Sequence, residues 1–163
     1  MNFAANEIIM QIKQFEDLNL SHFSYAILSD CEKKMILIDP ARNPKPYIDY
    51  AKEMDAQITG VIETHPHADF VSSHLEFHDH AGATIYTSRL AEVTYPHESF
   101  DEGQQIQLGK IRLTSINTPG HSPDSICILF SPFVGFFHYS IHLINICSSL
   151  SQHSHSKVHR YSN

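Results

Sequence analysis

A chain of 163 residues is long enough to form one domain with a buried core. Its 18 acidic side chains outnumber its 11 basic ones, which argues against a nucleic-acid-binding surface. No apolar run is long enough to cross a bilayer, and no basic segment followed by an apolar core opens the chain. The three cysteines, Cys31, Cys127 and Cys147, are widely separated, so we expect a cytoplasmic protein in a reducing compartment.

The hydrophobic pattern predicts an α/β domain over residues 10–130. In its first half, we expect strands at 11–15, 23–27, 35–38 and 58–62, and a helix that begins near Pro44 and carries Tyr47, Ile48, Ala51 and Met54. In its second half, we expect a helix over 71–80, a strand at 82–86, a loop at 95–100, a hairpin of 104–108 with 111–116, and a strand at 125–130. The alternation at 23–27 predicts a half-buried strand. A strand, a helix and a strand that ends in a polar loop are typical of a layered α/β fold.

Metal-binding side chains are concentrated directly after the strand at 58–62. His65, His67 and Asp69 are each two residues apart, so in an extended segment they point to the same side. Imidazole and carboxylate together suit iron, zinc or manganese. His121 is a further candidate, because it lies on a turn rich in proline and glycine, where histidine is seldom a core residue.

The other polar residues near these segments are expected at turns or at the surface, with one exception. For Asp39, in an Asp-Pro pair at a strand end, an ordinary turn is favoured, and the alternative that it faces the site stays open. His78, His80 and His97 are expected to face solvent. His74 lies one helical turn from the loop, and the sequence leaves its role open.

The composition changes after Phe130. Residues 131–163 contain Lys157 and Arg160 as their charged side chains, no acidic residue, and many serines and histidines. We expect a strand or two within 133–146 and a disordered end from residue 148. The domain is therefore placed at 10–130, and 131–163 is treated as an atypical tail.

Three separated motifs resemble the metallo-β-lactamase superfamily. They are Ile36-Leu37-Ile38-Asp39-Pro40, Glu63-Thr64-His65-Pro66-His67-Ala68-Asp69-Phe70-Val71-Ser72-Ser73-His74 and Thr118-Pro119-Gly120-His121-Ser122-Pro123. The histidine-rich motif that begins at Glu63 is most similar to the persulfide dioxygenase branch, especially bacterial members fused to rhodanese domains. The resemblance covers about residues 10 to 130. It implies an αββα sandwich with a metal at one edge, of which this chain holds only the N-terminal part complete.

The resemblance also implies a reaction. Superfamily hydrolases of the glyoxalase II type carry a histidine for a second metal after the aspartate, where this chain has Phe70. The persulfide dioxygenase branch implies a single Fe(II) held by His65, by His121 and by a later aspartate, with zinc as the other metal considered. His67 and Asp69 would then act close to the metal as catalytic groups. The implied substrate is glutathione persulfide or a similar small persulfide, oxidised to sulfite with release of the thiol.

The sequence departs from the family pattern in its last part. No acidic residue follows Asp124, so the later aspartate ligand has no counterpart, although His138 or His142 could complete a three-histidine site. We hypothesise that residues from about 131 onward belong to a shifted or foreign reading frame. Two alternatives to a dioxygenase therefore stay open: a zinc-dependent thioester hydrolase, and an inactive fragment that binds metal.

Overall fold

The computed structural model describes residues 10–18, 20, 22–68, 70–132 and 142–144, and its larger sheet has six strands. In spatial order these are β1 (Met10–Asp17), β2 (His22–Ser29), β3 (Lys34–Ile38), β4 (Gln57–Ile62), β5 (Thr84–Thr87) and β6 (Glu98–Ser99). The first three strands are antiparallel, and β3 to β6 run parallel to one another. Because β3 and β4 are parallel neighbours, their carboxyl ends meet at one edge of the sheet.

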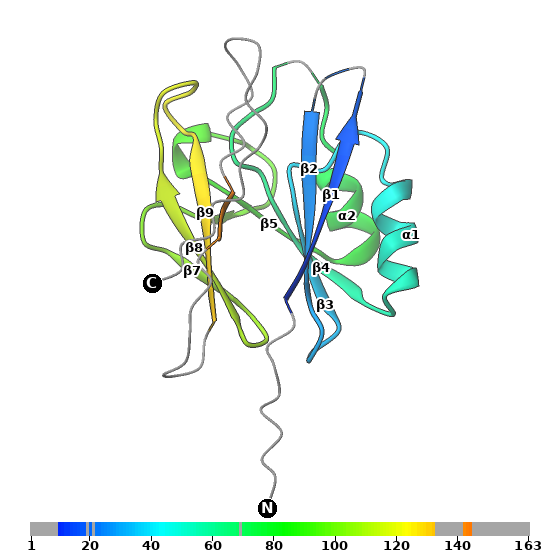
Figure 1. The fold of residues 1–163 in the computed structure, drawn as a ribbon. Coiled ribbons are helices and arrows are strands. Elements are labelled where there is room, and N and C mark those ends of the chain that lie inside the picture. Colours follow the sequence, from blue (N-terminus) through cyan, green and yellow to red (C-terminus); the bar gives the residue numbers. More distant parts are fainter. Residues whose placement is uncertain (1–9, 19, 21, 69, 133–141, 145–163) are drawn as a thin grey trace, which may run out of the picture.

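Two helices cover one face of this sheet (Figure 1). Helix α1 (Lys45–Glu53) connects β3 to β4, and α2 (His74–Ala81) connects β4 to β5. Proline precedes α1, where a missing backbone N–H costs nothing, and Gly82 ends α2 with a left-handed φ of 67°. A short 3-10 helix, Arg89–Ala91, follows β5. Side chains of the sheet and of both helices form the apolar core on this face, which includes Leu28, Met35, Leu37, Tyr47, Val61 and Phe77.

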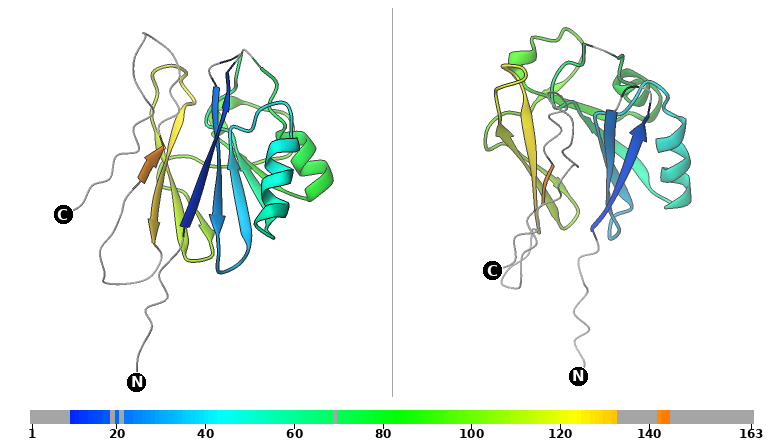
Figure 2. Two further views of the ribbon diagram at one scale, coloured as in Figure 1. Left: turned by 45° about the vertical axis from the view of Figure 1, so that its right-hand side comes forward. Right: turned by 45° about the horizontal axis from the view of Figure 1, so that its top comes forward.

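A second, antiparallel sheet packs on the other face of the first (Figure 2). Its strands, in spatial order, are β10 (His142–Ile144), β9 (Ile126–Pro132), β8 (Ile111–Asn117) and β7 (Gln105–Leu108). The core between the sheets includes Ile27, Ile38, Ile62, Phe100, Leu113, Ile128 and Phe130. Three layers of the expected αββα sandwich are thus present, and no helix among the described residues covers the outer face of the second sheet.

Most of the predicted elements are confirmed, and the differences have simple causes. Strand β2 is buried at nearly every position because α1 and α2 cover one face of the sheet and the second sheet covers the other. The expected loop at 95–100 contains the two-residue strand β6. The helix expected over 71–80 begins only at His74 and ends at Ala81.

The expected boundary at residue 130 lies within a strand, because β9 continues to Pro132. The tail also contributes β10, in line with the strand expected within 133–146. The rest of the tail lies outside the described residues. Within the described part of the chain, no helix is long and apolar enough to span a membrane.

Candidate metal centre

Three loops meet at one edge of the sandwich. Asp39 follows β3, the segment from Glu63 to His67 follows β4, and His121 lies in the turn between β8 and β9. A backbone hydrogen bond joins the two sheets at this edge, where the Ile126 N–H donates to the Thr64 carbonyl at 2.9 Å. Residues from both sheets therefore surround the same place.

Three of the predicted metal-binding histidines lie together here. The ring centroid of His65 is 4.3 Å from that of His67 and 5.2 Å from that of His121. His65 and the side chain of His67 are buried, while His121 is exposed. The structure therefore brings the three imidazoles together, with one of them open to solvent. The fourth predicted residue, Asp69, lies outside the described residues.

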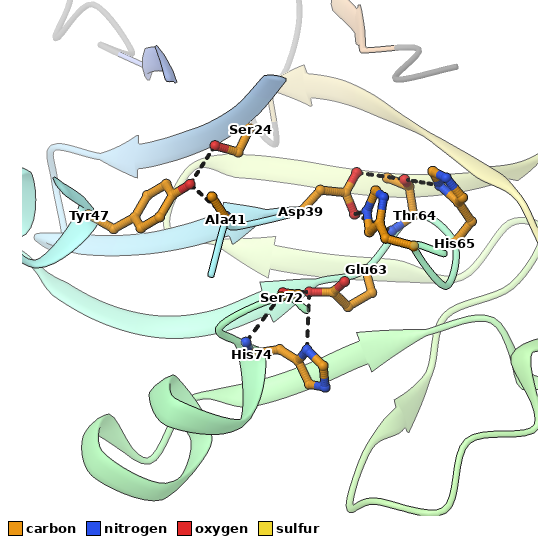
Figure 3. Close-up of polar contacts among 10 residues, drawn as sticks. Ser24, Asp39, Ala41, Tyr47, Glu63, Thr64, His65, Ser72 and His74 are labelled. Carbon is orange, nitrogen blue, oxygen red and sulfur yellow. Dashed lines mark hydrogen bonds and ion pairs between the residues drawn. The ribbon is translucent and has the colours of Figure 1, made fainter. Parts of the chain in front are cut away.

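Of the two interpretations of Asp39, the ordinary turn is wrong, and the alternative that it faces the site is confirmed. Asp39 is fully buried, with a left-handed φ of 47° that aspartate tolerates better than most residues. Its Oδ1 accepts the backbone N–H of Thr64 at 2.7 Å, and its Oδ2 accepts the Thr64 hydroxyl at 2.6 Å (Figure 3). Nε2 of His67 lies 3.3 Å from Oδ1. Asp39 is thus part of the centre rather than a surface turn.

These contacts decide which ring nitrogens are available to a metal. The Thr64 hydroxyl donates its one hydrogen to Asp39, so it must accept from Nδ1 of His65, which lies 3.0 Å away. That places the proton on Nδ1 and leaves the lone pair of His65 on Nε2. The Asp39 carboxylate lies near Nε2 of His67 outside hydrogen-bond geometry, and its charge favours a proton on that nitrogen, which leaves the lone pair of the neutral ring on Nδ1.

The two buried carboxyl groups of the centre have opposite pKa shifts. Burial opposes the ionisation of Asp39, but the adjacent imidazole of His67 and the two donors of Thr64 together lower the pKa of Asp39. Burial, followed by the charge of Asp39, raises the pKa of Glu63 well above its usual range. Asp39 is therefore the ionised member of the pair and Glu63 the protonated one. Burial also lowers the pKa of His65, which keeps its imidazole neutral, as a metal ligand must be.

Two buried carboxyl groups and one imidazole form a second set of possible metal ligands. Among the residues that the structure describes, Asp39, Glu63 and His67 form the one group whose ligand atoms all lie within 4.8 Å of one another. Hydrogen-bond donors already occupy these carboxyl groups, from Thr64 at Asp39 and from Ser72 at Glu63. We therefore assign the carboxyl groups to the support of His67, and the lone pairs of the imidazoles to the metal.

Sequence reasoning did not find His22, the first residue of β2. It is 3% exposed, and its ring centroid is 5.4 Å from that of His67 and 4.2 Å from that of Phe70. Phe70 in turn lies 4.3 Å from the ring of His67. The three rings form an aromatic wall on one side of the centre. Only a lone histidine before an apolar strand marks this position in the sequence, and that signal is weak.

Asp124 and Glu63 were also missed as residues of this region, and His74, whose role the sequence left open, lies here as well. Asp124 is buried in the turn that carries His121, and it accepts a hydrogen bond from the Ser122 hydroxyl. The charge of Asp124 acts to raise the pKa of His65. Nδ1 of His74 lies 3.6 Å from Oε1 of Glu63. Glu63 and His74 belong to the motif around His65, and Asp124 directly follows the motif around His121, but spacing alone does not reveal where these side chains lie.

The other histidines discussed above that the structure describes lie apart from the centre. His80 is exposed as expected, whereas His78 and His97 are partly buried, with Nδ1 of each 2.9 Å from a backbone carbonyl. His142 pairs with Phe130 in the second sheet. Phe130 lies four residues along β9 from Ile126, on the order of 13 Å at strand spacing, so the backbone of His142 is distant from the site edge. His138 lies outside the described residues.

Comparisons with known proteins identify similar chains. Residues 20–131 match the family model described as the metallo-beta-lactamase superfamily. A metallo-beta-lactamase structure from Staphylococcus aureus subsp. aureus COL is 34% identical, with a TM-score of 0.71, and the match covers 76% of this chain and 39% of that one. The structure of ETHE1 from Myxococcus xanthus is 26% identical, with a TM-score of 0.70, over 74% of this chain and 54% of that one.

Among curated relatives, a hydroxyacylglutathione hydrolase of Hydrogenovibrio crunogenus is 30% identical over 100 residues, which are 59% of this chain and 36% of that protein. The first curated relatives are matched over 36% to 56% of their own length. The chain therefore spans about half of these proteins or less.

Proposed function

Because the chain belongs to the metallo-beta-lactamase superfamily and has its fold, we propose that the centre holds one metal ion, which serves the oxidation of a small persulfide. The proposed ligands are His65 through Nε2, His67 through Nδ1, and His121. Asp69, beyond the described residues, is the carboxylate that the sequence offers beside them. The activity belongs to the whole protein, since this chain spans only part of the length of its relatives.

The observation that carries this proposal is the position of Phe70. It follows Asp69 directly, where the hydrolase pattern requires a histidine for a second metal, and a phenyl ring cannot ligate. Its ring instead packs between those of His22 and His67, at 4.2 and 4.3 Å. A site limited to one metal, with histidine and carboxylate donors, suits an iron centre that leaves positions open for oxygen and substrate.

The donor set fits such an ion. Two of the imidazoles present defined lone pairs, and burial keeps His65 neutral. Fe(II) bound there supplies a redox centre with open positions for a sulfur ligand and O₂. Asp39 holds the His67 ring in place, and the wall of His22 and Phe70 excludes water from one side. The exposed His121 marks the side from which a substrate enters.

The proposed reaction converts one persulfide, one O₂ and one water into one thiol and one sulfite. The terminal sulfur is oxidised and its bond to the inner sulfur breaks, while both atoms of O₂ are reduced. Water supplies the third oxygen of sulfite, and the inner sulfur leaves as the thiol. Glutathione persulfide is the substrate we propose, in the cytoplasm.

A zinc-dependent thioester hydrolase is the second candidate. A specific observation favours it: a curated relative 30% identical to this chain is named a hydroxyacylglutathione hydrolase. Imidazole ligands also suit zinc. Both candidates use the same histidines, so the metal and the substrate distinguish them.

The test compares the two reactions on the same purified protein. One sample is loaded with Fe(II) and given glutathione persulfide, and oxygen uptake and sulfite are measured. The other is loaded with zinc and given lactoylglutathione, and thiol release is measured. His65→Ala and His121→Ala should abolish oxygen uptake, while His80→Ala, at an exposed position outside the centre, should leave it unchanged. Thiol release under zinc without oxygen uptake under iron would favour the hydrolase. Metal binding without either reaction would leave a chain that only binds metal.

A further inference from the structure

The loop that carries His65 and His67 is closed at its base by one hydrogen bond. Glu63 directly follows β4, and Ser72 lies two residues before the start of α2. The Ser72 hydroxyl donates to Oε1 of Glu63 at 2.5 Å, and both residues are buried (Figure 3). The two ends of the loop are thus joined side chain to side chain.

Further contacts fix the Ser72 end of the loop. The Ser72 hydroxyl also accepts the backbone N–H of His74 at 3.3 Å. The neighbouring Ser73 donates its hydroxyl to the Ala41 carbonyl at 2.7 Å, so the start of α2 is attached to the segment that follows Asp39. The ring of Tyr95 covers His74, with their centroids 4.6 Å apart. The loop is therefore held at a base that itself has little freedom to move.

We propose that Glu63 and Ser72 form a clasp that positions His65 and His67 for the metal. The inference rests on the metal site of the proposed function, but it does not depend on which reaction occurs there. Both residues act through the loop and not by contact with the substrate, so they are positioning residues. The role of Glu63 in this clasp is that of a hydrogen-bond acceptor.

The clasp explains why a buried glutamate stands beside a buried aspartate. Ligand atoms of Asp39, Glu63 and His67 all lie within 4.8 Å of one another, a costly arrangement for two carboxyl groups. Asp39 serves the ring of His67, and Glu63 serves the loop that carries it. An apolar residue at position 63 would leave the Ser72 hydroxyl without its acceptor inside the protein.

The first test measures backbone hydrogen exchange in the metal-free protein by mass spectrometry. Ser72→Ala should speed exchange in residues 64–68 by about tenfold, because the loop loses its closing bond. Ser115→Ala is the matched control: Ser115 is a buried serine whose hydroxyl donates to the Phe100 carbonyl at 3.1 Å in the second sheet. It should leave exchange in residues 64–68 unchanged. Equal exchange in wild type and Ser72→Ala would overturn the clasp, whether or not the protein binds metal.

The second test measures affinity for Co²⁺ or Zn²⁺ by competition with a chelator. Ser72→Ala should weaken binding about tenfold, the lower end of the effect of outer-shell partners, and alter the Co²⁺ absorption spectrum. Ser115→Ala should bind the metal ion with wild-type affinity, even if urea unfolding shows that Ser72→Ala and Ser115→Ala lose similar amounts of stability. Equal losses of affinity in both variants would show a general effect of stability and overturn the positioning role.

Glu63→Gln keeps the test valid if Ser72→Ala does not fold. The amide oxygen of glutamine accepts the Ser72 hydroxyl as the carboxyl oxygen does. This variant should retain loop protection and the cobalt spectrum of the wild type, whereas Glu63→Leu should lose both. Loss of protection in Glu63→Gln as large as that in Glu63→Leu would overturn the acceptor role. Absence of metal binding in the wild type would instead contradict the proposed function, and the exchange data would still decide the clasp.

Discussion

Nε2 of His67 lies 3.3 Å from Oδ1 of Asp39, a fully buried carboxylate held by both donors of Thr64. The same Thr64 hydroxyl contacts Nδ1 of His65 at 3.0 Å. One carboxylate therefore controls two imidazoles, one directly and one through a hydroxyl group. The orientation of both rings follows from the position of Asp39 at the end of β3.

Replacement of Asp39 should therefore weaken metal binding. Asp39→Ala removes the partner that fixes His67 and leaves the Thr64 donors unpaired, so affinity for zinc should fall by about 10- to 100-fold. The metal-free protein should also lose stability, by about 3 kcal/mol. Chelator competition and urea unfolding measure the two effects. Asp49→Ala, which breaks the exposed pair with Lys45 on α1, serves as control and should change neither. An unchanged zinc affinity in Asp39→Ala would contradict the supporting role of Asp39.

The aromatic wall should contribute to stability, and loss of the Phe70 ring should not admit a second metal, because alanine offers no ligand either. Phe70→Ala removes ring contacts with His22 and His67, each worth about 1 kcal/mol beyond the area it buries, so the free energy of unfolding should fall by at least about 2 kcal/mol. Zinc content, measured by elemental analysis, should stay at one ion per chain. Leu75→Ala, at an exposed position of α2, should cost less than about 0.5 kcal/mol. A wild-type content of two zinc ions per chain would contradict the single-metal site.

Acidification should destabilise the metal-free protein in part through His74. Burial lowers the pKa of His74 below its usual value, so near neutral pH and just below it the unfolded chain binds more protons than the folded one. The contribution of His74 to the free energy of unfolding should therefore fall as the pH decreases from about 7.5 to about 5.5, while the raised pKa of Glu63 acts in the opposite direction in every variant. His74→Asn should show a smaller fall. Some dependence should remain, because burial also lowers the pKa of His65.

Urea unfolding at constant ionic strength over this pH range measures the effect. His80→Asn, at an exposed position of the same helix, should retain the wild-type dependence. Identical slopes for the wild type and His74→Asn would contradict the assignment.

The β7–β8 hairpin should be sensitive to the side chain at its turn. Gly109 has a left-handed φ of 58°, and a Cβ there would collide with the Ser29 hydroxyl and lie 2.9 Å from Sγ of Cys31. Gly109→Ala should therefore cost about 3 kcal/mol, through backbone strain and the clash with the β2–β3 turn. Gly103→Ala provides a matched control, since its φ is also left-handed but a Cβ meets open space, and it should cost about 1 kcal/mol. Thermal or urea unfolding measures both, and equal costs would contradict the contact.

Local sequence patterns were sufficient to predict the features that depend on residues close together in the chain, such as strands and pairs of nearby histidines. The apolar run of β3 and the alternation of β8 predict strands because burial imposes their periods. His65 and His67 were found because they lie two residues apart, and His121 because its turn is unusual. Glu63 and His22 were missed, and Asp39 was assigned first to a turn, for the opposite reason. Their partners lie on other strands and loops, so only the folded sheets bring them together. Asp39 also resembled one of the commonest turn signals.

Thr64 connects more than the two imidazoles. Its carbonyl accepts the N–H of Ile126, so the residue that supports the centre also ties the six-stranded sheet to the four-stranded one. Ligands from both sheets would let a bound ion hold the two sheets together. The supply of metal would then help to determine how much folded protein a cell contains. At a free metal concentration 100 times the dissociation constant, the gain is about 2.7 kcal/mol, comparable to the loss from a severe core mutation. Starvation for the metal would then reduce protein abundance as well as activity.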